Sequence, residues 1–266
     1  MRMSRRPSPQ LGFTLMEMAL VVLAMGIVLT TLMITTERAG GDTPVAQEAL
    51  MDSAASRLFD FARRNARLPC PDVNGDGYED GTEGICTADI KSGGIPYATI
   101  GMGLSGPVGT GVDRQFVYSI NRGGGNSGRD LTRAAERSLP ALDPVGSSSY
   151  MNLDDFKQAV INALAAGLEG GETYVTGNDV DSGLSDCSRP LANMAFVLAH
   201  AGPRNADGAG GDFDGVNPAG GWTSGTKWAA VKSAVCFAGP GKPNTPTYDD
   251  QVRAVSFTEL LGVLNR

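Results

Sequence analysis

The pattern of apolar and polar residues changes sharply near the start of the chain. Residues 1–12 are largely polar and contain three arginines but no acidic residue, whereas residues 13–36 are apolar apart from one charged side chain, Glu17. As an α-helix, this 24-residue segment would extend about 36 Å, which is enough to cross a bilayer. We therefore predict a cationic leader on the cytoplasmic side, followed by one membrane-spanning helix.

The remaining residues, 37–266, carry helix and strand patterns in mixed order. Apolar residues three and four apart predict an amphipathic helix over 45–67 with Pro44 at its start, and Asn152 is placed to cap another helix over 153–168. Strand patterns occupy residues 94–101, 114–120, 173–176 and 192–199. The last is almost entirely apolar, which predicts a buried central strand. We therefore expect an α+β fold with a sizeable core.

Glu17 is explained neither by a simple membrane anchor nor by a secretory signal. A carboxylate inside a membrane helix costs several kcal/mol, so it needs a partner. A secretory signal has a shorter apolar segment, with a small-residue cleavage site after it. Here the apolar segment is long, and the small residue, Gly12, stands before it.

The sequence from Gly12 to Glu17, Gly-Phe-Thr-Leu-Met-Glu, resembles the N-terminal signal of type IV pilins and type II secretion pseudopilins. The resemblance implies that a prepilin peptidase cleaves after Gly12 and methylates the new amine of Phe13. It also implies that Glu17 pairs with the N-terminal amine of a neighbouring subunit during filament assembly. The physics agrees, because that amine would be a cation at membrane depth and Glu17 its natural counter-charge.

Three further passages are similar to a subgroup of large bacterial pilin-like proteins. They are Leu-Pro-Cys-Pro-Asp at 68–72, the His-Ala-Gly passage that begins at His200, and the C-terminal residues 249–261. The resemblance implies a long N-terminal helix, part membrane-spanning and part amphipathic, packed on a small antiparallel sheet in a loop-rich, disulfide-bonded head. It also implies a short helix over 258–265.

The same resemblance divides the chain into three parts and gives each a location. Residues 1–12 would be the prepilin leader, 13–36 the transmembrane and filament-core helix, and 37–266 the globular head. The protein would first lie in the bacterial inner membrane with its head in the periplasm, and then in a filament.

The overall charge argues against one class of partner. The formal net charge is −7, and loss of a leader with three arginines and no acid would bring it near −10. An acidic chain without basic clusters is not typical of nucleic-acid binding, so we expect no nucleic-acid partner.

The cysteine count indicates disulfides. The four cysteines are Cys70, Cys86, Cys187 and Cys236. An even number in a translocated domain predicts two bridges, and among the three possible pairings sequence proximity favours Cys70–Cys86 and Cys187–Cys236. A zinc site is not expected, because no Cys-x-x-Cys pair is present and His200 is the only histidine.

Residues 72–83 fit the twelve-residue pattern of calcium-binding loops. The predicted ligands are the side chains of Asp72, Asn74, Asp76 and Glu83 and the main-chain carbonyl of Tyr78. No helix pattern follows the loop, so it is not a true EF-hand, but a Cys70–Cys86 bridge would close it at its base. We predict a structural Ca²⁺ here; the alternative is a metal-free cluster of Asx-turns.

A second acidic loop and the single histidine are less informative. Asp207, Asp212, Asp214 and Asn217 lack the ordered spacing of the first loop, so we expect a solvated surface loop rather than a second cation site. His200 is expected to be a structural residue at a strand end. With one histidine, no nucleophile elbow and no phosphate-binding glycine loop, we predict that the protein is not an enzyme.

These observations favour a pilin-like structural subunit, a minor pilin or a pseudopilin, that assembles with other subunits into a type IV pilus or a type II secretion pseudopilus. The alternative is a membrane-anchored or filament-tip module that binds a surface, glycan or secreted substrate through its calcium loop. An anchored periplasmic enzyme is a third interpretation, with the least support from the sequence.

Overall fold

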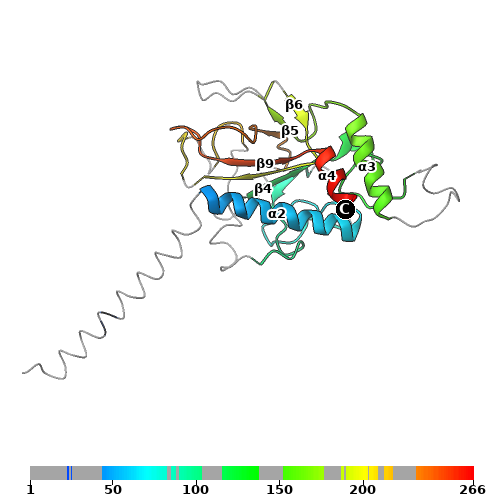
Figure 1. Cartoon of the computed structure of the whole chain (residues 1–266), viewed down its shortest axis with the longest axis horizontal. Coiled ribbons are helices and arrows are strands. Elements are labelled where there is room, and N and C mark those ends of the chain that lie inside the picture. Colours follow the sequence, from blue (N-terminus) through cyan, green and yellow to red (C-terminus); the bar gives the residue numbers. More distant parts are fainter. Residues whose placement is uncertain are drawn as a thin grey trace, which may run out of the picture. The chain divides into compact units, whose positions relative to one another are not determined.

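The structure is a computed structural model of the full chain, shown in Figure 1. It describes residues 23, 25, 44–82, 85–87, 90–103, 116–137, 152–176, 187–188, 190–202, 204–208, 213–217 and 232–266. By its internal contacts the chain divides into two compact units, Met1–Thr43 and Pro44–Arg266. Within the described ranges, no helix combines the length and hydrophobicity that crossing a bilayer requires. The predicted leader and nearly all of the predicted membrane helix lie outside those ranges.

The second unit begins with the longest described helix, α2 (Pro44–Asn65). Proline suits the first turn, because its missing N–H would have no partner within the helix. Side chains spaced three and four apart are buried: Met51, Ala54, Ala55, Leu58, Phe61 and Ala62. After the last turn, Ala66 has a left-handed φ of 51°, a conformation that commonly ends a helix.

The apolar face of α2 packs on an antiparallel sheet of four strands (Figure 1). In spatial order these are β3 (Ser92–Gly94), β4 (Phe116–Ile120), β7 (Phe196–His200) and β9 (Gln251–Val255). Alternate residues of β4 belong to two cores: Tyr118 lies in the core with α2, and Val117 lies in the core on the other face. Both central strands are therefore buried at every position, as expected for strands covered on two sides.

A smaller sheet contributes to the second core. Its order is β6 (Pro190–Asn193), β5 (Tyr174–Thr176) and β8 (Cys236–Phe237), and β5 pairs with β8 in parallel. Val175 and Phe237 pack with Val117 and Val197 of the larger sheet. A two-stranded ladder, β1 (Gly81–Thr82) and β2 (Ile85–Cys86), lies near the first disulfide.

Two capped helices complete the core beside α2. Helix α3 (Leu153–Ala165) begins at a capping box in which the Asn152 side chain accepts from the N–H groups of Asp154 and Asp155, while the Asp155 carboxylate accepts from the N–H of Asn152. Helix α4 (Phe257–Leu264) is capped by Ser256. The predicted start of α3 and the predicted short C-terminal helix are therefore confirmed. Helix α3 ends three residues earlier than predicted.

Two of the predicted strands are wrong. Strand β3 ends at Gly94, and the chain then turns, with Met102 N–H donating to the carbonyl of Tyr97 at 2.8 Å. The predicted strand over 192–199 is two strands in two different sheets, β6 and β7. Asn193 holds the chain at the crossing point, because its side-chain amide donates to the carbonyls of Glu169, Glu172 and Thr173.

Both favoured disulfides are present. Cys70–Cys86 has a Cα–Cα distance of 5.4 Å, and Cys187–Cys236 has one of 5.9 Å. The described unit is thus an α+β fold in which an N-terminal helix packs on an antiparallel sheet and two disulfides cross-link the loops.

Candidate metal site

The predicted calcium loop folds into a compact turn built from side-chain to backbone bonds. Asp72 accepts from the N–H groups of Gly75 at 2.5 Å and Gly77 at 2.7 Å. Asn74 Oδ1 accepts from Asp76 N–H at 2.9 Å, and Asp76 Oδ1 accepts from the next N–H but one at 2.8 Å. The bonds that Asn74 and Asp76 accept from the N–H two residues later are Asx-turns, a feature of the metal-free alternative, whereas the Asp72 bonds reach three and five residues along the loop.

A further carboxylate, Asp80, closes this turn from the opposite side. Its Oδ2 accepts from the N–H groups of Val73 and Asn74, and its Oδ1 accepts from the Asn74 side-chain amide at 2.8 Å. Asp80 was not among the ligands predicted from the sequence. Its position would have identified it, because Asp80 is ninth from Asp72 and the ninth position of calcium loops often acts through water.

Burial changes the pKa of Asp72, the first of the predicted calcium ligands. Asp72 is 2% exposed, and this burial raises its pKa to about 6 against the lowering effect of the Gly77 and Gly75 N–H groups; the charges of Asp76 and Asp80 raise it further. Burial of a carboxylate beside other carboxylates favours protonation, or a nearby cation. Tyr78 is 62% exposed, and Glu83, the last predicted ligand, lies outside the described residues.

The loop is tied to the end of α2 by an ion pair. Arg67 donates two parallel hydrogen bonds to Glu79, at 2.6 and 2.7 Å, and Cys70 N–H donates to the same carboxylate at 3.0 Å. Burial alone would raise the pKa of Glu79, but the hydrogen bonds from Arg67 and Cys70 lower it. Together with the Cys70–Cys86 bridge, this pair fixes both ends of the turn.

A second group of carboxylates, which the sequence did not predict to lie together, joins two residues just before β9 to one from an earlier loop. Asp214, Asp249 and Asp250 each place one carboxylate oxygen within 4.8 Å of the others, and together they can hold a metal ion. They are 0%, 3% and 2% exposed. The expectation that residues 207–217 form a solvated surface loop is therefore wrong for Asp214, and also for Asn217, which is 1% exposed.

Backbone and side-chain donors hold this acidic cluster in place. Asp214 accepts from the N–H groups of Ala206 at 2.8 Å and Asp207 at 3.1 Å through one oxygen, and from that of Asp249 at 2.8 Å through the other. Asp250 Oδ2 accepts at 2.8 Å from both the Asp214 N–H and the Asn217 amide. These hydrogen bonds thus join residues that are more than thirty positions apart in the sequence.

Burial governs the protonation of the cluster. It raises the pKa of Asp250 to about 7, although the hydrogen bonds from Asn217 and the Asp214 N–H work in the opposite direction, and the Asp214 charge adds to the rise. Burial likewise raises the pKa of Asp249, although Arg204 opposes it. Two of the three side chains are therefore poorly stabilised as anions by the protein groups around them.

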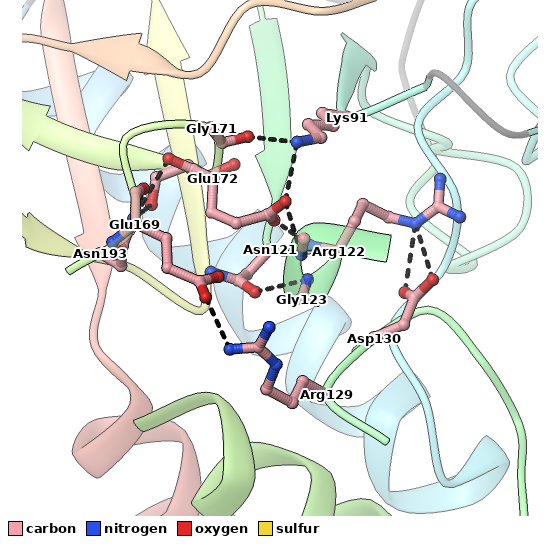
Figure 2. Close-up of polar contacts among 12 residues, drawn as sticks. Lys91, Asn121, Arg122, Gly123, Arg129, Asp130, Glu169, Gly171, Glu172 and Asn193 are labelled. Carbon is pink, nitrogen blue, oxygen red and sulfur yellow. Dashed lines mark hydrogen bonds and ion pairs between the residues drawn. The ribbon is translucent and has the colours of Figure 1, made fainter. Parts of the chain in front are cut away.

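Another buried carboxylate, Glu172, accepts hydrogen bonds from three protein donors. It is 1% exposed and accepts from Lys91 Nζ at 2.7 Å, Arg122 N–H at 2.5 Å and Gly124 N–H at 2.8 Å (Figure 2). Gly123 to Gly125 all have positive φ, so their backbone can wrap around this side chain. The glycine turn therefore binds an internal carboxylate and has a structural role.

The other predicted residues are quickly placed. His200 is buried at the end of β7, and its ring makes a T-shaped contact with that of Phe116, 4.8 Å between centroids, which agrees with a structural role. Gly12, Phe13 and Glu17 lie outside the described residues.

Comparison with known proteins adds no relative, since no protein-family model, curated protein or solved structure matches this chain.

Proposed function

We propose that the protein is a pilin-like structural subunit, cleaved after Gly12 and assembled through its N-terminal helix into a type IV pilus or a type II secretion pseudopilus. The observation that carries the proposal is the Gly12–Glu17 sequence followed by 19 residues without a charge, from Met18 to Thr36. Membrane-embedded carboxylates require a partner, and the free amine of a processed neighbour supplies one. Other pilin or pseudopilin subunits and the prepilin peptidase are then its partners.

Two features of the described unit support this proposal. An N-terminal helix packed on an antiparallel sheet is the arrangement that the family resemblance implies. Two disulfides are typical of a domain outside the cytoplasm, which agrees with a head in the periplasm or on a filament.

The N-terminal residue and intact mass of protein recovered from its native membrane test the processing step. We expect a chain that begins at methylated Phe13. A chain that still begins at Met1 in cells with an active prepilin peptidase would contradict the proposal.

Assembly is tested separately by substitution of the membrane carboxylate. We expect Glu17→Ala to insert in the membrane but fail to assemble, whereas the neighbouring Met16→Ala, which changes no charge, should still assemble. Normal assembly of Glu17→Ala would exclude the pairing with a neighbouring amine.

We further propose that the loop from Asp72 to Glu83 binds a structural Ca²⁺ in the head. Its support is the ordered spacing of oxygen donors and the buried carboxylate of Asp72. Calcium should raise the melting temperature of the wild type, and the rise should shrink in Asp76→Ala but persist in Asp60→Ala, an exposed carboxylate on α2. An equal rise in wild type and Asp76→Ala would refute calcium binding by the loop.

One observation favours a second candidate function. Tyr78 projects from the calcium-type loop with 62% of its surface exposed, as an aromatic contact residue of a membrane-anchored or filament-tip binding module would. An unprocessed chain that binds a surface, glycan or secreted substrate only with calcium, and loses binding in Tyr78→Ala, would establish this function instead.

A further inference from the structure

The acidic cluster formed by Asp214, Asp249 and Asp250 combines strong burial with close spacing. One oxygen from each side chain lies within 4.8 Å of the other two. Two of the side chains come from the start of the segment that leads into β9, and the third comes from a loop 35 residues earlier. Only the tertiary fold brings these three oxygens together.

Protein groups leave this cluster short of positive charge. Among the described residues, one cation bonds to it: Arg204 Nε donates to Asp249 Oδ2 at 3.1 Å, and the Arg204 side chain is 64% exposed. A solvent-exposed guanidinium is a weak counter-ion, and carboxylates that are nearly inaccessible to water need pairing or a metal.

A separate observation indicates where a ligand is missing. Asp249 is 3% exposed, yet its Oδ1 accepts no hydrogen bond from any described group. Almost all buried polar atoms in native proteins have a partner, so a lone carboxylate oxygen calls for one. Gly202 lies directly against this oxygen, and a Cβ there would come within 2.1 Å of it, so this position accepts only glycine.

The chemistry of the donors selects the ligand. All three are carboxylate oxygens, which suit hard cations, and both disulfides leave no described thiolate to attract a softer metal. Among hard cations, Ca²⁺ accepts six to eight oxygen ligands in flexible geometry, whereas Mg²⁺ demands a near-ideal octahedron and gives up its water reluctantly, so a cluster buried away from water suits Ca²⁺ better. Asp250 also lines a pocket of about 490 Å³ together with Tyr248 and Gln251.

We propose that Asp214, Asp249 and Asp250 bind a second divalent cation of the calcium class, with Asp249 Oδ1 as a direct ligand. This ion ties the loop around Asp214 to the first residues before β9. The site is independent of the calcium loop at Asp72 and of filament assembly.

The test is the calcium stoichiometry of the full chain in detergent, measured by equilibrium dialysis against radioactive calcium. We expect two bound equivalents in the wild type, one in Asp76→Ala, one in Asp249→Asn and none in the double variant. Asp60→Asn, which removes an exposed carboxylate from α2, is the matched control and should bind two. In the wild type, excess Mg²⁺ should displace little of the calcium bound at the acidic cluster, which is the equivalent that Asp249→Asn lacks.

The outcomes separate the two sites. If Asp249→Asn binds as much calcium as the wild type, the proposal is overturned. The amount of calcium that Asp76→Ala loses tests the calcium loop alone. Should Asp249→Asn fail to fold by circular dichroism, Asp76→Ala by itself decides: one remaining equivalent supports the site, and none overturns it.

Discussion

Replacement of Glu172 by glutamine tests whether the buried network of Figure 2 stabilises the head. Three donors converge on this carboxylate: the Lys91 ammonium and the backbone N–H groups of Arg122 and Gly124. Glutamine has nearly the same shape but offers only one acceptor atom. Its amide oxygen can stay with Lys91 and Gly124, which places the NH₂ group against the Arg122 N–H.

The expected cost follows from that mismatch. The variant loses the charge-assisted hydrogen bond from the Arg122 N–H, which is worth about 1.5–3 kcal/mol, and that N–H is left facing the glutamine NH₂ group. Lys91 is 24% exposed, so water can solvate part of its charge once the carboxylate is gone. We expect a loss of about 3 kcal/mol in the free energy of unfolding, or about 6–12 °C in melting temperature for a unit of this size.

Urea denaturation under non-reducing conditions, followed by circular dichroism, measures this loss. The control is Asp60→Asn, which removes an exposed ion pair with Arg63 and should change stability by less than about 0.5 kcal/mol. A loss below about 1 kcal/mol in Glu172→Gln would refute the reasoning.

Three further predictions concern stability. The Arg67 hydrogen bonds lower the pKa of Glu79 below its ordinary value of 4.5, so they stabilise the fold fully at neutral pH, and this stabilisation is lost as the pH falls below about 4.5 and through the lower pKa of the folded state. The melting temperature of Glu79→Gln should therefore fall less steeply with acid than that of the wild type, and an equally steep fall would contradict this. Leu58→Ala should cost about 2.7–5 kcal/mol in urea denaturation, because the side chain is fully buried between α2 and the sheet, and a cost under 1 kcal/mol would mean that this core is not formed. Replacement of the Cys187–Cys236 pair by alanines should cost about 4 kcal/mol by the entropy of its 49-residue loop, more than the same change in the 16-residue loop of the first bridge, and the reverse order would show that loop entropy is not the dominant effect.

Local signals in the sequence were sufficient for several parts of the structure. Pro44 and Asn152 start helices because a first-turn proline and a capping side chain act on their immediate neighbours. The two disulfides close loops of 16 and 49 residues, shorter than the loops of any other pairing, and shorter loops cost less entropy to close. The same locality lets residues 12–17 suggest a processing and assembly signal before any fold is known.

Other features depend on long-range packing. The strand expected over 192–199 divides between two sheets because Asn193 bonds to carbonyls 20 to 24 residues earlier, which no local pattern encodes. Glu172 becomes a structural anchor only because the backbone N–H groups of Arg122 and Gly124, 50 and 48 residues earlier, bond to it.

The acidic cluster shows the same division between local and tertiary information. The sequence identifies Asp214 only as part of a glycine-rich loop, and solvation is the sensible expectation for such a segment. In the structure it is buried against Asp249 and Asp250, which lie 35 and 36 positions later. Sequence by itself determined which residues carry charge, whereas the tertiary structure decided which charges lose water, because burial depends on what distant segments place above them.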